Sequence, residues 1–402
     1  MAESQNLQMK PLFTAQREAT EEISEARNNK LPEINSTLTL SYIGSGFTTK
    51  RNLSDYQKAP IPHFGSGLGV SVSQPVWSGG AITAGIEMAE MKLTAARLAT
   101  EMKRDDIRFY IAGFYLDLYK CINLRKVIVG NIEQAQKVLD EMHARYEQGV
   151  ALRNDITRYE LLVSNLELDL VKVDNTAKIL RSELCRSVGL PLDTELMPDT
   201  TILAQALPTG SEQTWREEAV NYSPALQLAK TRVEMSRTAE KIVEADRLPK
   251  IGLQAGWTMD GPILVEIPPI NRNLSYWFVG VGVKYNLSSL YKNNKSRARS
   301  RATTIKAVEE YEAMRENVEL DVRSAHIRYL EAFEELKSRQ KGVELAERNY
   351  GITFTRYGGD MALITDMLDA ANSKLEAEQR LVDARINIIY HYYKLLFTSG
   401  KI

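Results

Sequence analysis

The sequence predicts a mainly α-helical protein with a small β part, built as a duplicated unit of two strands, a long helix and a returning helix. Three observations lead to this fold class: a repeated motif, two long proline-free stretches, and four short segments of strict alternation. The motif "RYEQGVALRNDITRY" at 145–159 returns as "RYGGDMALITDMLDA" at 356–370, which sets Arg145 on Arg356, 211 positions later. The same offset relates "GVSV" at 69–72 to "GVGV" at 280–283. Solenoid repeats are about 20–50 residues long, so this spacing indicates internal duplication.

Long helices are expected where proline is absent, between Pro75 and Pro191 and again after Pro269. Apolar residues recur there with the spacing of a coiled coil. A helix from Gly80 to Tyr146 would be roughly 100 Å long at about 1.5 Å per residue. Such a rod requires a partner helix, so each repeat is expected to form a coiled-coil hairpin with the repeated motif at its tip. The first seam contains Ile107, Phe114, Cys121, Ile128, Ala135 and Met142.

Four segments alternate with a period of two, which is typical of strands with two different faces. One face is apolar, with aromatic residues near the ends, and the other is small and polar. Two interpretations stay open at this point: a membrane β-barrel with a wet interior and a soluble antiparallel sheet with one solvated face. In the first, Val70, Val72, Leu253 and Val281 face lipid.

Four strands cannot close a membrane barrel, because the smallest known use about eight. An open edge in lipid leaves backbone groups unpaired at a cost of several kcal/mol each. If the strands lie in a membrane, the chain must therefore oligomerise, and either two or three copies would satisfy this requirement.

Composition excludes several classes of protein. The net charge is −1, which gives no field for a nucleic-acid partner. The two cysteines are far apart, and the four histidines have no spacing typical of a metal site or a triad. No nucleophile motif or phosphate-binding loop occurs. We therefore expect no enzyme, no cofactor and no metal. There is also no apolar stretch of eighteen residues for a membrane-spanning helix.

The offset also predicts the boundaries of the two repeats. The first repeat is expected at 1–210, with strands at about 31–44 and 66–77, a helical hairpin at about 79–188 and a connecting segment at 189–210. The second is expected at 211–402, with strands at about 249–260 and 275–287 and a helical hairpin at about 289–398.

Taken together, these elements resemble the TolC-like outer-membrane efflux proteins. The segment "QPVWSGG" at 74–80 is similar to the junction at which strand meets long helix in that family, through Pro75, Trp77, Gly79 and Gly80. The second repeat departs from it with "YNLSS" at 285–289. "LPEI" at 31–34, "LPKI" at 248–251 and "ITDMLDA" at 364–370 also resemble family elements, and the resemblance covers almost the whole chain.

The resemblance implies a homotrimer that shares one twelve-stranded barrel in the outer membrane and one helical tunnel through the periplasm of a Gram-negative cell. It implies a passive exit duct for efflux or type I secretion, with a periplasmic adaptor protein, an inner-membrane transporter and outer-membrane lipid as partners. The segment 191–212 would belong to a belt around the tunnel, and a signal peptide is inferred to be missing from this chain. The alternative is a soluble coiled-coil scaffold that binds partners along its hairpins.

The acids of the tip motif are the first candidate site. Asp366 and Asp369 lie one turn apart, and we expect both to point away from a seam of Leu363, Met367 and Ala370. Asp155 occupies the place of Asp366 in the first repeat. The ordinary interpretation is solvated acids at a helix N-terminus, where carboxylates are favourable. The resemblance favours an acidic ring at the mouth of the pore.

Three further residues near the turns are candidates for a gate: Tyr357, its equivalent Tyr146, and Arg158, which stands where the second repeat has Asp369. A tyrosine on a coiled-coil seam is otherwise part of the core. Some family members close their mouth with an Arg after the tip turn, and the matching residue here is Ala362. The basic segment 291–301 is interpreted as a solvated helix start, near anionic lipid phosphates.

Overall fold

The computed structural model describes residues 6–198, 207–208, 210–266 and 269–402. Its contacts divide the chain into two compact units that run across both repeats. Unit 1 comprises Met1–Thr14, Arg97–Ala229 and Tyr311–Ile402, and unit 2 comprises Ala15–Ala96 and Lys230–Glu310. The helices are α2 (Lys10–Asn28), α3 (Ala81–Glu147), α4 (Arg153–Val188), α5 (Glu212–Tyr222), α6 (Pro224–Ala245), α7 (Ser289–Gly358) and α8 (Ile364–Thr398). The strands are β1 (Glu33–Tyr42), β2 (Gly46–Thr48), β3 (Gln57–Ala59), β4 (Phe64–Trp77), β5 (Lys250–Gly261) and β6 (Leu274–Lys284).

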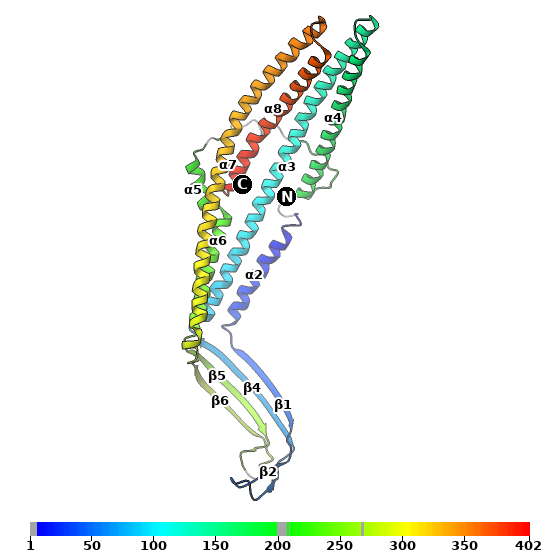
Figure 1. Ribbon diagram of the computed structural model, residues 1–402. Coiled ribbons are helices and arrows are strands. Elements are labelled where there is room, and N and C mark those ends of the chain that lie inside the picture. Colours follow the sequence, from blue (N-terminus) through cyan, green and yellow to red (C-terminus); the bar gives the residue numbers. More distant parts are fainter. Residues whose placement is uncertain (1–5, 199–206, 209, 267–268) are drawn as a thin grey trace. The chain divides into compact units, whose positions relative to one another are not determined.

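Unit 2 contains a four-stranded antiparallel sheet in the order β1-β4-β5-β6 (Figure 1). The first two strands come from one repeat and the last two from the other, and β4 joins β5 at the centre. Strands β1 and β6 are therefore the free edges. Strands β2 and β3 form a separate two-stranded sheet in the segment that connects β1 to β4.

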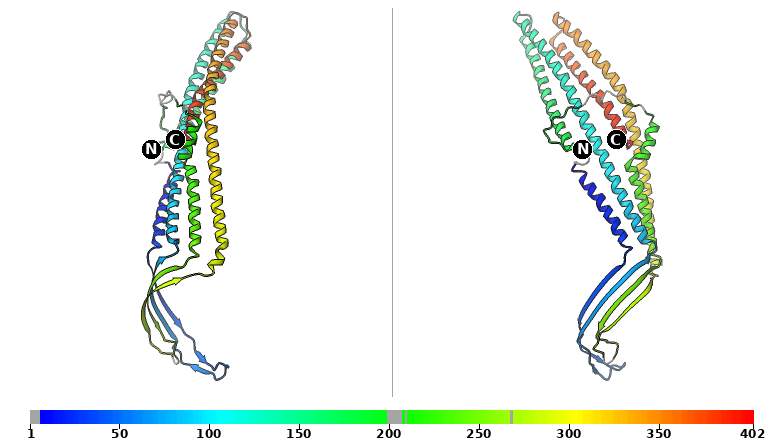
Figure 2. Two further views of the ribbon diagram at one scale, coloured as in Figure 1. Left: turned by 90° about the vertical axis from the view of Figure 1, so that its left-hand side faces the viewer. Right: turned by 180° about the vertical axis from the view of Figure 1, so that it is seen from behind.

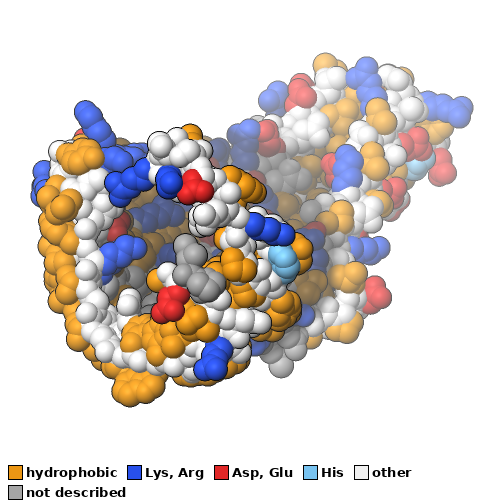
Figure 3. All heavy atoms as spheres, turned by 90° about the horizontal axis from the view of Figure 1, so that it is seen from below, with side chains coloured by type: hydrophobic (Ala, Val, Ile, Leu, Met, Phe, Trp, Pro, Cys, Tyr) orange, Lys and Arg blue, Asp and Glu red, His pale blue; other side chains and the backbone are white. Residues whose placement is uncertain are grey.

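The register places the apolar positions of neighbouring strands on one face of the sheet. Val72 is opposite Ile34 on one side and Ala255 on the other, and Leu253 is opposite Val281. The other face carries small and polar residues and is hollowed, with Thr37, Thr39 and Gly67 among the residues that line the hollow. Seen from below, hydrophobic side chains gather on the outer surface of the curved sheet (Figure 3).

A helix joins each strand of this sheet at the same end. Helix α2 precedes β1, α3 follows β4, α6 precedes β5 and α7 follows β6. The helices of unit 2 therefore keep the order of the strands, as the left view of Figure 2 shows. Of the helices that the structure describes, none is both long and apolar enough to cross a bilayer.

Unit 1 contains two helical hairpins, α3 with α4 and α7 with α8 (Figure 2). All four helices contribute to one hydrophobic cluster, because each presents apolar residues at the spacing of a coiled coil. Tyr159 and Met367 are almost fully buried in it. This cluster lies near the two turns, and it fixes one hairpin against the other where the candidate site lies.

The segment after α4 is described only in part, since 199–206 and 209 of the expected connecting segment 189–210 lie outside the described residues. Its last residues contact α7. The hydroxyl of Tyr329 donates to the carbonyl of Pro208 over 3.2 Å, and a ring nitrogen of His326 lies 3.1 Å from the carbonyl of Gly210. Both side chains are buried, and their hydrogen bonds attach the end of the connecting segment to the second long helix.

Candidate functional site at the helical tips

The two hairpin turns have the same backbone design. Gly149 in the first turn has φ 78°, and Asp360, 211 positions later, has φ 57°. Both residues adopt the left-handed conformation that ends a helix, which glycine adopts freely and an aspartate adopts at a cost. An aspartate in this place is therefore a feature to explain.

Arg145 explains it, because its guanidinium reaches from the end of α3 to the turn after α7. One nitrogen, Nη1, donates to the carbonyl oxygens of Tyr357 at 3.2 Å and Gly358 at 3.5 Å. The other, Nη2, forms an ion pair with the Asp360 carboxylate. The guanidinium carbon also lies 5.5 Å from the centre of the Tyr357 ring, within the range of a cation–π contact. We call these interactions the Arg145 contact.

The equivalent residue, Arg356, does not cross between the hairpins. Its Nη2 donates to the carbonyl of Met361 in its own turn, over 3.4 Å. The side chain of Arg145 is only 24% exposed, whereas Arg356 is exposed. The repeated Arg-Tyr pair therefore serves two different purposes in the two tips.

The predicted gate tyrosines also differ. Tyr357 is half-buried against the cluster of unit 1, and burial raises the pKa of its hydroxyl, with the nearby Asp155 carboxylate adding to the effect. Tyr146 is exposed, as is Arg158. The structure brings Arg145, Tyr357, Asp360 and Asp155 together and leaves Tyr146 and Arg158 at the surface.

The two acids of the second tip are both exposed, one turn apart. A carboxylate oxygen of Asp366 accepts the backbone N–H of Leu363 over 3.0 Å, so this acid caps α8. The expected seam was wrong at Leu363, which is 69% exposed. The reason is that Leu363 has extended backbone and precedes the helix, and Ile364 joins Met367 and Ala370 in the core instead.

Sequence reasoning missed Arg145 and Asp360 as site residues. The available signal was the alignment of "RYEQG" with "RYGGD", in which an acid replaces the glycine that the first turn uses. The Arg145 contact joins residues that are far apart in sequence. The periodicity of apolar residues within one helix therefore could not predict it.

The predicted junction residues lie where β4 meets α3. Pro75 is opposite Gly252, and the register shifts between Pro75 and Trp77, so the missing N–H of proline falls at a bulge. Gly79 and Gly80 follow with φ 66° and 88°. A Cβ on Gly79 would lie 2.8 Å from the carbonyl oxygen of Ala245, so only glycine fits this turn.

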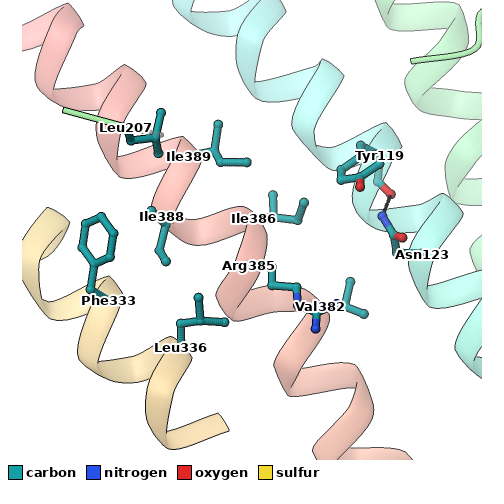
Figure 4. A pocket seen from close by; sticks show the side chains of 10 residues that line it. All are labelled: Tyr119, Asn123, Leu207, Phe333, Leu336, Val382, Arg385, Ile386, Ile388 and Ile389. Carbon is teal, nitrogen blue, oxygen red and sulfur yellow. Dashed lines mark hydrogen bonds between the residues drawn. The ribbon is translucent and has the colours of Figure 1, made fainter. Parts of the chain in front are cut away.

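A recess of about 400 Å³ lies elsewhere in unit 1, between α3, α7 and α8 (Figure 4). Its walls are mainly apolar, with Ile386 and Phe333 among them. The side-chain amide of Asn123 donates a hydrogen bond to the backbone carbonyl of Tyr119. Among the described lining residues few polar groups converge, and these alone do not make a specific ligand site. Across the described residues, no group of three or more metal-ligating side chains is assembled.

Comparison with known proteins agrees with this arrangement. The sequence model of the family described as "Outer membrane efflux protein" matches residues 1–190 and 215–396. The outer membrane protein TolC of Salmonella enteritidis is 20% identical over 212 residues, which cover 52% of this chain and 43% of that protein. The match therefore spans less than half the length of this curated relative.

Solved structures are similar over nearly the whole chain. The outer-membrane channel OprN has a TM-score of 0.81 at 17% identity, covering 100% of this chain and 88% of the other. The outer membrane protein VceC of Vibrio cholerae has a TM-score of 0.80 at 15% identity, covering 99% and 94%. At these identities the likeness shows the fold, which is that of the TolC-like tunnel proteins.

Proposed function

The chain belongs to the outer membrane efflux protein family, and from this premise we propose that three copies form a passive exit duct through the outer membrane of a Gram-negative cell. The duct serves an efflux or type I secretion system together with a periplasmic adaptor protein and an inner-membrane transporter. It carries out no chemistry of its own. The observation that carries the proposal is the sheet of unit 2, which has an exposed apolar face and two free edges.

The free edges are suited to ring closure. The four strands alternate in direction, so β6 of one copy lies antiparallel to β1 of the next. Three copies of four strands give a twelve-stranded barrel without an open edge, as lipid requires.

The dimensions of the sheet are suited to a bilayer. Strand β4 has 14 residues, which at about 3.3 Å per residue and a tilt of about 40° span roughly 35 Å of membrane. Aromatic residues mark both ends of the apolar face, with Tyr42 opposite Phe64 at one end and Trp77 opposite Ile251 at the other. Val70, Val72, Leu253 and Val281 lie between them on the face that contacts lipid in this proposal.

The tips form the periplasmic mouth of the duct. The Arg145 contact joins the two hairpins of each copy, and we assign it to the closed state. Tyr357 supports the contact through its ring, and Asp155 lies beside that tyrosine. Opening then requires the guanidinium to leave two carbonyl groups and one carboxylate at the same time.

Asp366 and Asp369 supply the acidic ring of the mouth. In a trimer they give six carboxylates in two layers about one turn apart, which attract cations as charged rings do in cation channels. Asp366 also caps α8. In this proposal the same residue therefore both caps the helix and lines the pore.

Exposed apolar residues at the tips provide the contact for the adaptor. Val150 and Leu152 in the first turn correspond to Met361 and Leu363 in the second, and all four are more than half exposed. The pairs repeat at the offset of 211, so each trimer presents six similar apolar points to its partner. More than half of each of these side chains is left uncovered by the described residues, and an adaptor tip would cover them.

Planar-bilayer recording of the purified protein tests the proposal. We expect a detergent-soluble trimer that inserts and conducts with a preference for cations. A monomer that is soluble without detergent and never conducts would contradict the duct and support the coiled-coil scaffold.

A further inference from the structure

Ion pairs cross every helix–helix seam of unit 2. This unit holds α2 from Ala15 on, the start of α3, the end of α6 and the start of α7, in the order of their strands. The pairs are Glu22–Lys92 and Arg27–Glu90 between α2 and α3, Lys241–Glu87 between α3 and α6, and Arg297–Glu244 between α6 and α7. Three seams within one chain are thus bridged by opposite charges.

Helix α7 carries a basic face that lies outside the three seams described above. At about 100° per residue, Lys292, Lys295 and Arg299 lie on the side of α7 opposite Arg297, which contacts α6. All three are exposed. We call them the basic face of α7.

Helix α2 carries a matching acidic face at the other edge of the unit. Glu18, Glu21 and Glu25 are exposed and lie beside Glu22, which pairs with α3. They have the spacing i, i+3, i+7, and the basic face of α7 has the same spacing. In the described part of the chain, none of these six charged residues has an ion-pair partner.

The two faces also agree in height above the sheet. Glu25 lies three residues before the end of α2 at Asn28, and Lys292 lies three residues after the start of α7 at Ser289. Glu18 and Arg299 are each ten residues from the same two ends. Because α2 runs toward the sheet and α7 runs away from it, antiparallel packing would set acid beside base along the whole stretch.

We propose that the basic face of α7 binds the acidic face of α2 of the next copy, as the fourth, intermolecular seam of the ring. This inference rests on the trimer of the proposed function and names what aligns its copies. Barrel closure brings β6 beside β1 of the neighbour, and α7 and α2 are the helices attached to those two strands. The complementary faces then favour this pairing of edges and repel two like edges.

Charge reversal tests the seam in the full-length protein. Lys292→Glu with Lys295→Glu and Arg299→Glu should lower the trimer fraction in detergent several-fold at low salt, as should Glu18→Lys with Glu21→Lys and Glu25→Lys. The six substitutions combined should restore the trimer. Arg301→Glu, a charge reversal on the side of α7 nearer to α6, is the control and should leave the trimer fraction close to wild type.

Disulfide formation gives a second measurement. Glu21→Cys with Lys295→Cys should produce covalent dimers and trimers on oxidation, and Glu21→Cys with Arg301→Cys should not. The wild-type protein could form a trimer while the combined variant shows no rescue and the cysteine pair forms no cross-link. This result would contradict the proposed seam but not the proposed trimeric duct. A wild-type chain that never trimerises would contradict the proposed function itself.

The other candidate for the basic face is anionic lipid. In that case the α7 reversal alone would weaken binding to vesicles that contain an anionic phospholipid, the α2 reversal would leave the trimer unchanged, and the combined variant would show no rescue. This pattern would also overturn the proposal.

Discussion

Arg145 and Arg356 occupy equivalent positions in the two hairpin tips, and their guanidinium groups bind different parts of the protein. Arg145 crosses to the turn of the other hairpin, where Asp360 and two carbonyl oxygens accept its hydrogen bonds. Arg356 stays within its own turn. The strands show the opposite behaviour, because Val70 and Val281, also 211 positions apart, lie on the same face of one sheet. The two repeats are therefore alike in the sheet and unequal at the tips.

The largest expected effect tests whether equivalent residues of the two repeats, Val70 and Val281, both face lipid. Val70→Arg and Val281→Arg should each cost about 2–4 kcal/mol of folding stability in lipid, because both place a charge near the middle of the bilayer. Denaturant titration of the protein refolded into vesicles measures this. Ser71→Arg, on the opposite face, is the control and should be mild. Equal tolerance at Val70 and Ser71 would favour a soluble sheet.

The next effect tests the difference between the tips. Asp360→Asn removes the charge that Arg145 binds while asparagine still tolerates the left-handed backbone. The Asp360 side chain is 71% exposed, so loss of the ion pair should destabilise the closed state by no more than about 1 kcal/mol. This corresponds to an increase of up to about fivefold in the open population. Cells that carry the variant should admit more of a large antibiotic that the outer membrane excludes. Gly149→Asn changes the equivalent place without removing a charge and should leave uptake unchanged.

A third prediction concerns the acids that only one tip has as a pair. Asp366→Asn with Asp369→Asn should lower the cation preference of the channel and its block by trivalent cations. The asparagine oxygen can still accept the Leu363 N–H, so folding should change little. Asp155→Asn should have a smaller effect, because this acid lies half-buried beside Tyr357. Reversal potentials in a salt gradient distinguish these cases, and an unchanged preference in the double variant would leave Asp366 as a helix cap alone.

The smallest effect is a loss of tip stability at high pH. Burial raises the pKa of Tyr159, Tyr350 and Tyr357 above the usual value near 10. A raised pKa in the folded state means that the folded tip keeps its protons longer than the unfolded chain. The contribution of these hydroxyl groups to folding stability is therefore fully present below about pH 10, and it is lost as pH rises above this value.

Replacement of one tyrosine provides the test of this pH effect. Tyr357→Phe should flatten the decline, measured as the melting temperature between pH 8 and 11, because one titrating hydroxyl is gone. Tyr146→Phe, the equivalent and exposed ring, is the matched control. The same slope in Tyr357→Phe and wild type would contradict a role for the buried hydroxyl.

Much of the fold was readable in the sequence because it depends on local periodicity. Alternation placed Val70 and Trp257 on one face, and the structure pairs them across β4 and β5. The spacing of apolar residues gave long helices whose seam residues Ile128 and Met142 are buried. The family followed from the order of these elements and is confirmed by the match to residues 1–190 and 215–396.

The tip site was less accessible, because its contacts are not periodic. Leu363 was placed on the seam by spacing alone, whereas the first turn of α8 starts one residue later and turns Ile364 inward. The Arg145 contact depends on a left-handed aspartate and on the packing of two hairpins that are distant in sequence. The predicted roles of Asp366, Asp369 and the gate residues stay predictions.

Single-channel conductance of wild type, Arg145→Ala and Arg356→Ala in one planar bilayer tests most directly whether the unequal tips close the duct. The wild-type trimer should be mainly closed, Arg145→Ala should open far more often or more widely, and Arg356→Ala should resemble wild type. Equal conductance in all three, or equal opening in both variants, would contradict the assignment of the Arg145 contact to the closed mouth.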